Sequence, residues 1–244
     1  MSRFLAIPFF NFHEVKNRKL FFYAYFFPFF TVLALFIDSV FFTATYFDGR
    51  SLTNVLAITY FCLFFFSAQA YLRKLMFCMV FLSYLGELIF CKALGMYAYR
   101  TIDIPLYVPF GHAIVYASGF VFAGIPIIIS NEKKLKKIFF VALAILFLMV
   151  GFFLNDVFSL IFGLLFFILM KRKKWQMVYF TIAFCVIFIE LVGTYFRCWT
   201  WVPKTFGIIP AVNPPMGAVF FYAGGDVILA KIVSYWKSKT EISI

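Results

Sequence analysis

Apolar runs of about 20 residues recur along the whole chain, and each is long enough to cross a bilayer as a helix. Hydrophobic residues make up 65% of the 244 residues and charged residues only 13%, which leaves little polar surface for an aqueous domain. The bilayer core tolerates only structures that pair their own backbone groups, so the runs predict helices. We therefore expect an all-α, polytopic integral membrane protein. No polar or Pro/Gly/Ser-rich linker interrupts the runs, which indicates a single membrane domain over residues 1–244.

Eight transmembrane helices are expected from these runs. They lie near residues 21–45, 54–72, 75–95, 109–129, 138–154, 157–170, 175–196 and 216–235. The fifth and sixth are short and are separated by Asn155 and Asp156. The segment 138–170 therefore forms either a tight helical hairpin or one long kinked helix.

The basic residues indicate the orientation of the chain. The net charge of +12 does not indicate nucleic-acid binding, because the charges lie in short clusters between apolar runs. With eight spans, 17 of the 22 Lys and Arg residues fall on one side of the membrane, and the other five are Arg50, Lys92, Arg100, Arg197 and Lys204. An excess of basic residues is typical of the cytoplasmic side. We therefore expect a multi-pass protein of the plasma (inner) membrane with both termini in the cytoplasm.

One phrase occurs twice in the chain. The segments PFGHAIVYASG (109–119) and PMGAVFFYAGG (215–225) share the pattern P-x-G-x-x-x-x-Y-A-x-G, 106 residues apart. Before each copy come a Glu-Leu pair late in a span, two aromatic residues separated by one residue, and an Ile-Pro pair. This duplication predicts two repeats of four helices, over residues 20–130 and 138–236 approximately. Four spans return the chain to its starting side, so the repeats share one orientation, as in proteins built from parallel repeats.

The repeated Glu residues are the first candidates for a functional site. Glu87 and Glu190 lie in matching places in the outer half of the bilayer, and Asp226 lies near its midplane. An ionisable residue within a span is costly and normally faces a partner or a water-filled cavity. His112, at the outer end of the fourth span, is the fourth candidate for a catalytic group. The alternative is structural: each Glu accepts hydrogen bonds from the aromatic loop that follows it, and the His is merely hydrated.

Two acids have no counterpart in the other repeat. Phe120 occupies the position that corresponds to Asp226, an asymmetry that is expected when one half of a duplicated fold specialises. Asp38, in the first span, has no match either, and we expect it to be a hydrogen-bonded structural residue or a residue of the vestibule.

Aromatic and amide side chains complete the candidate site. The residues expected to bind the substrate are Tyr97, Tyr99, Trp199, Trp201, Asn213, Tyr116 and Tyr222. The Tyr and Trp pairs of the two loops form either an aromatic wall of the cavity or an interfacial belt. Tyr116 and Tyr222 are expected to direct their hydroxyl groups at the two Glu residues, and Asn213 is also suited to cap the last helix. The glycines of the repeated phrase are expected to let neighbouring helices approach closely.

Several kinds of site are excluded by the residues present. His13 and His112 are the only histidines and fall on opposite sides of the membrane, so no histidine-based metal site is expected. The chain has no H-E-x-x-H and no G-x-x-x-x-G-K-[ST] motif. Ser118 lies on the same helix as His112 and has no second His to activate it, which excludes a serine-protease site. We expect neither a metal nor a cofactor.

Two loop motifs carry a resemblance to a known family. The first half reads GMYAY at 95–99 and then VP at 108–109, after a helix that contains a Glu. The second half reads WTW at 199–201, then GIIP at 207–210 and Asn213. These stretches resemble the membrane carotenoid-biosynthesis family that includes acyclic-carotene hydratases.

The resemblance implies a lipid-like, isoprenoid substrate. The chain departs from the family after Asn213, where Pro214-Pro215 stand in place of Gly-Trp, and at 110–112, which lack the expected Trp. Hydrating or isomerising a polyene needs an acid, aromatic faces that stabilise a carbocation, and controlled water. We therefore expect a membrane enzyme that uses Glu87 and Glu190 as acid and base on an isoprenoid or another lipid. Its cavity is expected to open to the extracytoplasmic side.

Two other functions stay open at this stage. Parallel repeats with acids near the midplane are also typical of transporters, so a small-molecule or proton-coupled transporter is the first alternative. A non-catalytic subunit that assembles with another membrane protein is the second. The expected partners are membrane lipids, a lipid or isoprenoid substrate and, in the last case, a membrane-protein partner; no nucleic acid is expected.

Overall fold

The computed structural model describes residues 18–101, 103–171, 173 and 176–242, so His13 lies outside it. Helices form most of this part of the chain. They are α1 (Arg18–Ile37), α2 (Val40–Thr45), α3 (Arg50–Ser67), α4 (Ala70–Glu87), the π-helix η2 (Leu88–Ala93), α5 (Tyr107–Ala123), α6 (Pro126–Ser130), α7 (Glu132–Phe153), α8 (Val157–Lys171), α9 (Gln176–Tyr195), the 3-10 turn η3 (Met216–Ala218) and α10 (Val219–Ile242). The short strands are β1 (Tyr97–Tyr99), β2 (Trp199–Trp201), β3 (Lys204–Thr205) and β4 (Ile209–Pro210).

Six helices of the described residues are long and apolar enough to cross a membrane. They cover Arg18–Ile37, Arg50–Ser67, Ala70–Ala93, Glu132–Phe153, Gln176–Tyr195 and Met216–Trp236. Two shorter apolar helices, α5 and α8, coincide with the expected fourth and sixth spans. The prediction of an all-α protein is confirmed, and its long apolar helices are consistent with a membrane protein.

The first expected span, 21–45, is wrong in its second half. α1 ends at Ile37, and a turn at Asp38 and Ser39 separates it from α2. Ser39 caps α2, because its hydroxyl oxygen accepts a hydrogen bond from the Phe42 N–H at 2.9 Å. The Asp38 side chain is fully buried in ion pairs with two arginines from other segments. The helix therefore breaks where tertiary ion pairs form.

The segment 138–170 is a helical hairpin, which decides between the two alternatives. α7 begins at Glu132, earlier than expected, and has 22 residues, so of these two helices only α8 is short. Asn155 is left-handed with φ of 55°, and Asp156 accepts a hydrogen bond from the Ser159 N–H at 3.0 Å. These residues end one helix and cap the next.

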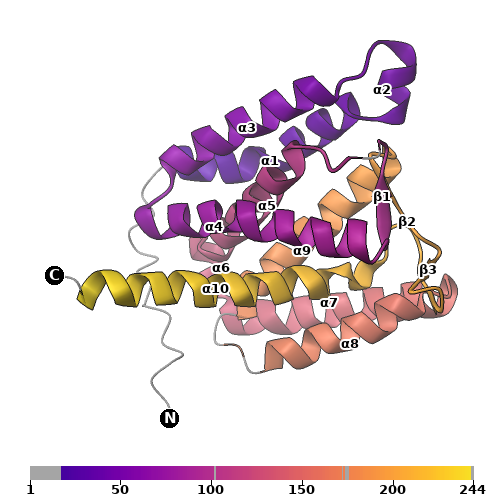
Figure 1. Cartoon of the computed structure of the whole chain (residues 1–244). Helices are drawn as coiled ribbons and strands as arrows, with labels where there is room; N and C mark the ends of the chain where they lie inside the picture. Colours follow the sequence, from indigo (N-terminus) through magenta and orange to yellow (C-terminus); the bar gives the residue numbers. More distant parts are fainter. Residues whose placement is uncertain (1–17, 102, 172, 174–175, 243–244) are drawn as a thin grey trace.

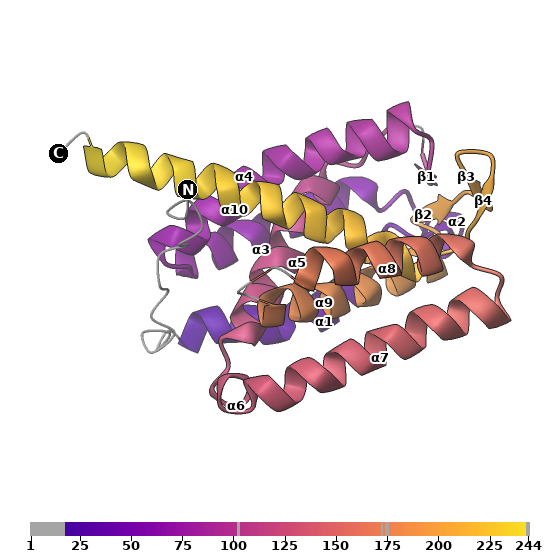
Figure 2. The same ribbon diagram turned by 90° about the horizontal axis from the view of Figure 1, so that it is seen from below.

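Helix α5 lies at the centre of the bundle. Most of its residues are buried, and α1, α3, α4 and α9 pack around it. It approaches α9 closely, since a methyl group added at Gly119 would lie 2.7 Å from Ile182 Cα. The Thr181 hydroxyl donates a hydrogen bond to the Gly119 carbonyl oxygen at 2.7 Å in the same region. Figures 1 and 2 show α4 and α10 side by side along another part of the bundle.

The strands gather at one end of the bundle. β1 and β2 pair antiparallel, with Tyr97 opposite Trp201 and Tyr99 opposite Trp199. β3 and β4 form a second two-stranded sheet. In Figure 1 the strands and α2 lie at the end of the molecule opposite the C-terminus of α10. The two predicted aromatic loops therefore meet at one end of the helices.

Candidate functional site

Glu87, at the end of α4, is almost completely buried. The phenol hydroxyl groups of Tyr97 and Tyr99 donate hydrogen bonds to its Oε2 at 2.9 and 2.7 Å, and His112 Nε2 lies 3.1 Å from its Oε1. Burial, followed by the charge of Glu87, raises the pKa of both phenols well above the usual value. Both phenols therefore keep their protons and can donate. Glu87 thus ties β1 and α5 to the end of α4.

Glu190, in α9, has a matching environment and is equally buried. The indole N–H groups of Trp199 and Trp201 donate hydrogen bonds to its Oε2 at 2.9 and 3.0 Å. The Tyr222 hydroxyl donates to its Oε1 at 2.8 Å. An indole N–H can only donate, so Glu190 is the acceptor in both of its contacts with β2.

The two carboxyl groups and their partners form one continuous assembly. We name the two parts the Glu87 cluster (Glu87, Tyr97, Tyr99 and His112) and the Glu190 cluster (Glu190, Trp199, Trp201 and Tyr222). The ring of Tyr97 lies 4.7 Å from that of Trp201 across the strand pair. The imidazole of His112 stacks on the Tyr222 ring with centroids 5.0 Å apart. The strand pairing and the stacked rings therefore join the clusters.

Eight of the sequence-predicted site residues lie in these two clusters, but two expectations are wrong. The side chain that contacts Glu87 from α5 is His112, one helical turn before Tyr116, which was expected there. Asn213 is exposed and does not cap the last helix. Its Oδ1 accepts a hydrogen bond from the Trp201 backbone N–H at 3.0 Å, so it positions β2 instead.

Two cavities meet at the clusters. Cavity A, with a volume of about 70 Å³, lies among α1, α3, α5 and α9. Cavity B, with a volume of about 360 Å³, lies among α4, η2, α5, α9 and α10. The residues that line both are Glu87, Tyr97, His112, Val115, Glu190, Trp201 and Tyr222. The clusters thus form a polar wall between two mostly apolar spaces.

Asp226 lines cavity B one helical turn beyond Tyr222. It is 4% exposed, and its Oδ2 has no hydrogen-bond partner among the described residues. Tyr116 lines the same cavity, away from Glu87's hydrogen bonds. A buried carboxylate without a partner is costly, so Asp226 is suited to carry a proton or to bind a polar group in cavity B.

The four glycines of the repeated phrase divide into two pairs. Gly119 has no room for a side chain, and a methyl group at Gly217 would lie 2.8 Å from Ser159 Cα. Gly111 and Gly225 have no atom within 4 Å of an added methyl group, and they line cavities A and B respectively. Close helix approach is therefore confirmed for the first pair and is wrong for the second.

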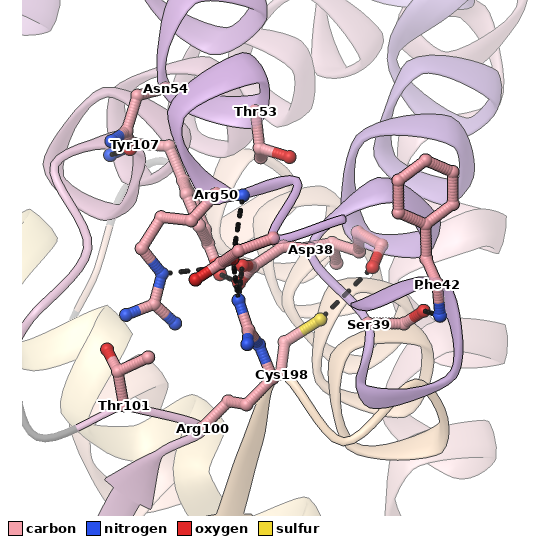
Figure 3. A network of polar contacts seen from close by, with 12 residues as sticks. Asp38, Ser39, Phe42, Arg50, Thr53, Asn54, Arg100, Thr101, Tyr107 and Cys198 are labelled. Atoms are coloured by element: carbon pink, nitrogen blue, oxygen red, sulfur yellow. Dashed lines mark hydrogen bonds and ion pairs between the residues drawn. The ribbon is translucent and has the colours of Figure 1, made fainter. Parts of the chain in front are cut away.

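A charge cluster supports cavity A at the end of the bundle that carries the strands. The Asp38 carboxylate forms ion pairs with Arg100 Nη2 at 2.8 Å and with Arg50 Nε at 3.3 Å (Figure 3). It also accepts a hydrogen bond from the Tyr107 hydroxyl at 2.8 Å. Tyr107, the first residue of α5, also lines cavity A. The structural role expected for Asp38 is confirmed. The arginine partners were not predicted, although both were assigned to the side where the first span ends.

No group of three or more His, Cys, Asp or Glu side chains that could hold a metal ion occurs among the described residues. Comparisons of the chain with family models, with curated proteins and with solved structures found no match. The geometry of the two clusters and the two cavities is therefore the basis for a proposed function.

Proposed function

We propose that the chain crosses the plasma membrane eight times as two parallel repeats, with both termini in the cytoplasm. The clusters support this proposal, because each combines a Glu near the end of a helix, two donors from a strand and one contact from the following helix. Ala98 lies opposite Thr200 at the centre of the strand pair. An antiparallel pair has a local two-fold axis at its centre, and parallel repeats are related by such an axis along the membrane normal.

We further propose that the protein is an enzyme that acts on an isoprenoid or another lipid by acid/base chemistry. One observation carries this proposal: two buried, hydrogen-bonded carboxyl groups meet between two apolar cavities with aromatic walls. Ionisable groups are costly inside a membrane and are typical of functional sites there. Aromatic faces and carboxylates are also the groups that stabilise a carbocation.

The clusters suggest a division of roles. In hydration or isomerisation, a proton adds to one carbon of a double bond and leaves a positive charge on the other. Asp226, which has no partner for Oδ2, suits the acid that supplies this proton. Glu87 and Glu190 accept hydrogen bonds from Tyr and Trp, so they suit the base and the counter-charge. The base takes a proton from the attacking water in hydration, or from a neighbouring carbon in isomerisation.

The lining of the cavities favours an uncharged lipid. No Lys or Arg is present among the residues that line cavities A and B. Cavity B instead carries three carboxyl groups, from Glu87, Glu190 and Asp226. A phosphate or carboxylate head group would lose its hydration there without gaining a counter-charge. A hydrocarbon chain meets no such penalty, which agrees with an isoprenoid substrate.

Deletion of the gene followed by lipid profiling tests the proposal. We expect an apolar precursor to accumulate and its modified product to disappear. The wild-type gene should restore the product and a Glu190→Gln gene should not, while Glu132→Gln, a partly exposed change at the start of α7, serves as the matched control. Unchanged pigments, apolar lipids and polar lipids in the deletion strain would contradict an enzymatic role.

The unpartnered Asp226 carboxyl favours a proton-coupled transporter as a second candidate. A carboxyl group that faces a cavity from within a span is also how proton-coupled carriers bind their proton. Proton-driven uptake by the purified protein in liposomes, lost in Asp226→Asn, would favour this function. Combined with an unchanged lipid profile in the deletion strain, that result would replace the enzyme proposal.

A further inference from the structure

Two helix interfaces that correspond in the proposed repeat differ in their packing. Helices α5 and α9 of one interface correspond to α10 and α4 of the other. Gly119 packs directly on Ile182 in the first interface. The sequence spacings of the repeat place Gly225 and Met79 in the corresponding positions. Gly225 faces open space, and both residues line cavity B, so this second interface is separated where the first is closed.

The space between α4 and α10 reaches the outer surface of the bundle. Leu85 and Ile89 on one side and Ile228 on the other line cavity B, yet they are 52%, 43% and 50% exposed. The π-helix η2 starts directly after Glu87, and its wide turn carries Ile89 to the rim of the cavity. Single π-helical turns are frequent at functional sites. Cavity B therefore opens sideways between α4 and α10, which run alongside each other in Figures 1 and 2.

We propose that cavity B takes up a single uncharged apolar chain from the bilayer through this opening, and that Gly224 and Gly225 determine which chains fit. Along α4 the lining extends from Met79 to Glu87, about 12 Å at 1.5 Å per residue. Both glycines lack any neighbour within 4 Å of an added methyl group, so they widen the cavity beside Asp226. A chain bound there reaches the clusters with one end while the rest stays in the lipid.

The occupant is an uncharged molecule rather than a membrane phospholipid. A phospholipid chain in cavity B would bring its phosphate toward a lining that has three carboxyl groups and no Lys or Arg. Like charges and lost hydration both oppose that placement. The inference rests on the proposed function for the chemistry at the clusters, but the binding of the chain does not depend on turnover.

Fluorescence quenching by a neutral dibrominated long-chain alkane tests the binding. The full-length protein is placed in nanodiscs with Trp175 and Trp236 replaced by Phe, so that the emission comes from Trp199 and Trp201. Both are buried, and Trp201 lines cavities A and B, so bromine must enter a cavity to quench it, and the variants of Gly225 and Gly224 identify that cavity as B. We expect saturable quenching whose apparent affinity falls about tenfold or more in Gly225→Leu, which fills the cavity. Ile232→Leu, on the exposed part of the same helix, should bind like wild type.

Two results would overturn the proposal. The first is unchanged quenching in both Gly225→Leu and Gly224→Leu, each checked for wild-type elution by size exclusion; two variants are used in case one fails to fold. The second is quenching by dibrominated phosphatidylcholine in the nanodisc that is as strong as quenching by the alkane and that is lost in Gly225→Leu and Gly224→Leu. The occupant would then be a phospholipid. Failure of the proposed enzyme function has a different signature, namely saturable alkane binding with an unchanged lipid profile in the deletion strain.

Discussion

The Glu87 cluster and the Glu190 cluster have the same layout but different donors. Two phenols and an imidazole contact Glu87, whereas two indoles and one phenol contact Glu190. Phenol and imidazole groups can donate and accept hydrogen bonds, but an indole can only donate. The Glu87 cluster is therefore the better suited to move a proton. The Glu190 cluster is the better suited to hold a fixed charge beneath an apolar aromatic surface.

The two corresponding helix interfaces differ between the halves, as the hydrogen-bond donors do. Phe120 is a buried residue near the closed contact of α5 with α9, whereas Asp226 lines the open space between α10 and α4. The unpartnered acid and the lateral opening thus occur together, in one of two corresponding interfaces. Under the proposed duplication, the shared layout places both carboxyl groups, and the differences between the halves locate the proposed substrate site in cavity B.

Replacing either Glu by Gln should produce the largest effect on activity. The Gln carbonyl oxygen can accept but its NH2 group cannot, so at least one donor in the cluster loses its partner, and we expect conversion to fall about 10²- to 10⁴-fold. If the clusters differ as described, Glu87→Gln should also change the pH profile of the remaining activity, and Glu190→Gln should lower activity at every pH alike. Conversion by membranes with equal amounts of folded protein measures this. Identical pH profiles for the two variants would remove the functional difference between the clusters.

The corresponding glycines Gly119 and Gly225 should respond to alanine with opposite signs. Gly119→Ala forces a methyl group against Ile182, and we expect it to lower the free energy of unfolding by about 1–3 kcal/mol. Gly225→Ala adds a methyl group in open space within a helix, and we expect a gain of about 0.5–1 kcal/mol. Unfolding of both variants in one detergent measures the difference. Destabilisation of similar size in both would show that the interface of α4 and α10 is packed after all.

The helices were predictable because apolar runs of bilayer length leave the chain few alternatives. The break after Ile37 was not, since it depends on Arg50 and Arg100, which are distant in sequence from Asp38. The meeting of Glu, Tyr and Trp side chains was predictable from the repeated sequence pattern, although the strand pairing that joins them was not.

The partner of Glu87 was predicted wrongly for a physical reason. Equal spacing in the two copies pointed to Tyr116, the counterpart of Tyr222. The second copy, however, enters its helix through the 3-10 turn η3, whereas α5 is α-helical from its start. A 3-10 turn rises about 2.0 Å per residue against about 1.5 Å in an α-helix, so the two helices differ slightly in register where they begin. The contact with Glu87 comes from His112, one helical turn before Tyr116.

The stacked rings of His112 and Tyr222 should couple the two clusters energetically. A double-mutant cycle of His112→Ala and Tyr222→Leu, which removes both rings, is expected to show a coupling of about 1 kcal/mol in the free energy of unfolding, because each side chain contacts its own Glu and the other ring. A cycle of His112→Ala with Glu132→Gln, which share no partner, should be additive. Additivity in both cycles would mean that the clusters act independently.

The smallest effect should come from Asp48, whose partners within the described part of the chain, Arg50 and Arg100, both belong to the first half. Arg100 follows β1 and pairs with Asp48 at 2.5 Å, whereas Val202 follows β2 and carries no charge. The hydrogen bond from Arg100 lowers the pKa of Asp48 below its usual 3.8, against an opposing effect of burial. A lowered folded-state pKa stabilises the fold above the unfolded-state pKa, and this contribution disappears as the pH falls through the folded-state value.

Asp48→Asn is therefore expected to lower the free energy of unfolding by less than about 1 kcal/mol at pH about 5, since the Asp48 side chain is 56% exposed and screened by solvent. The difference from wild type should shrink toward zero as the pH falls from 3.8 through the lower folded-state pKa, below which the wild-type carboxyl is neutral as well. Added salt should reduce it as well. Unfolding measured across this pH range at two salt concentrations provides the comparison. A difference that persists in acid would mean that Asp48 does not stabilise the fold through its charge.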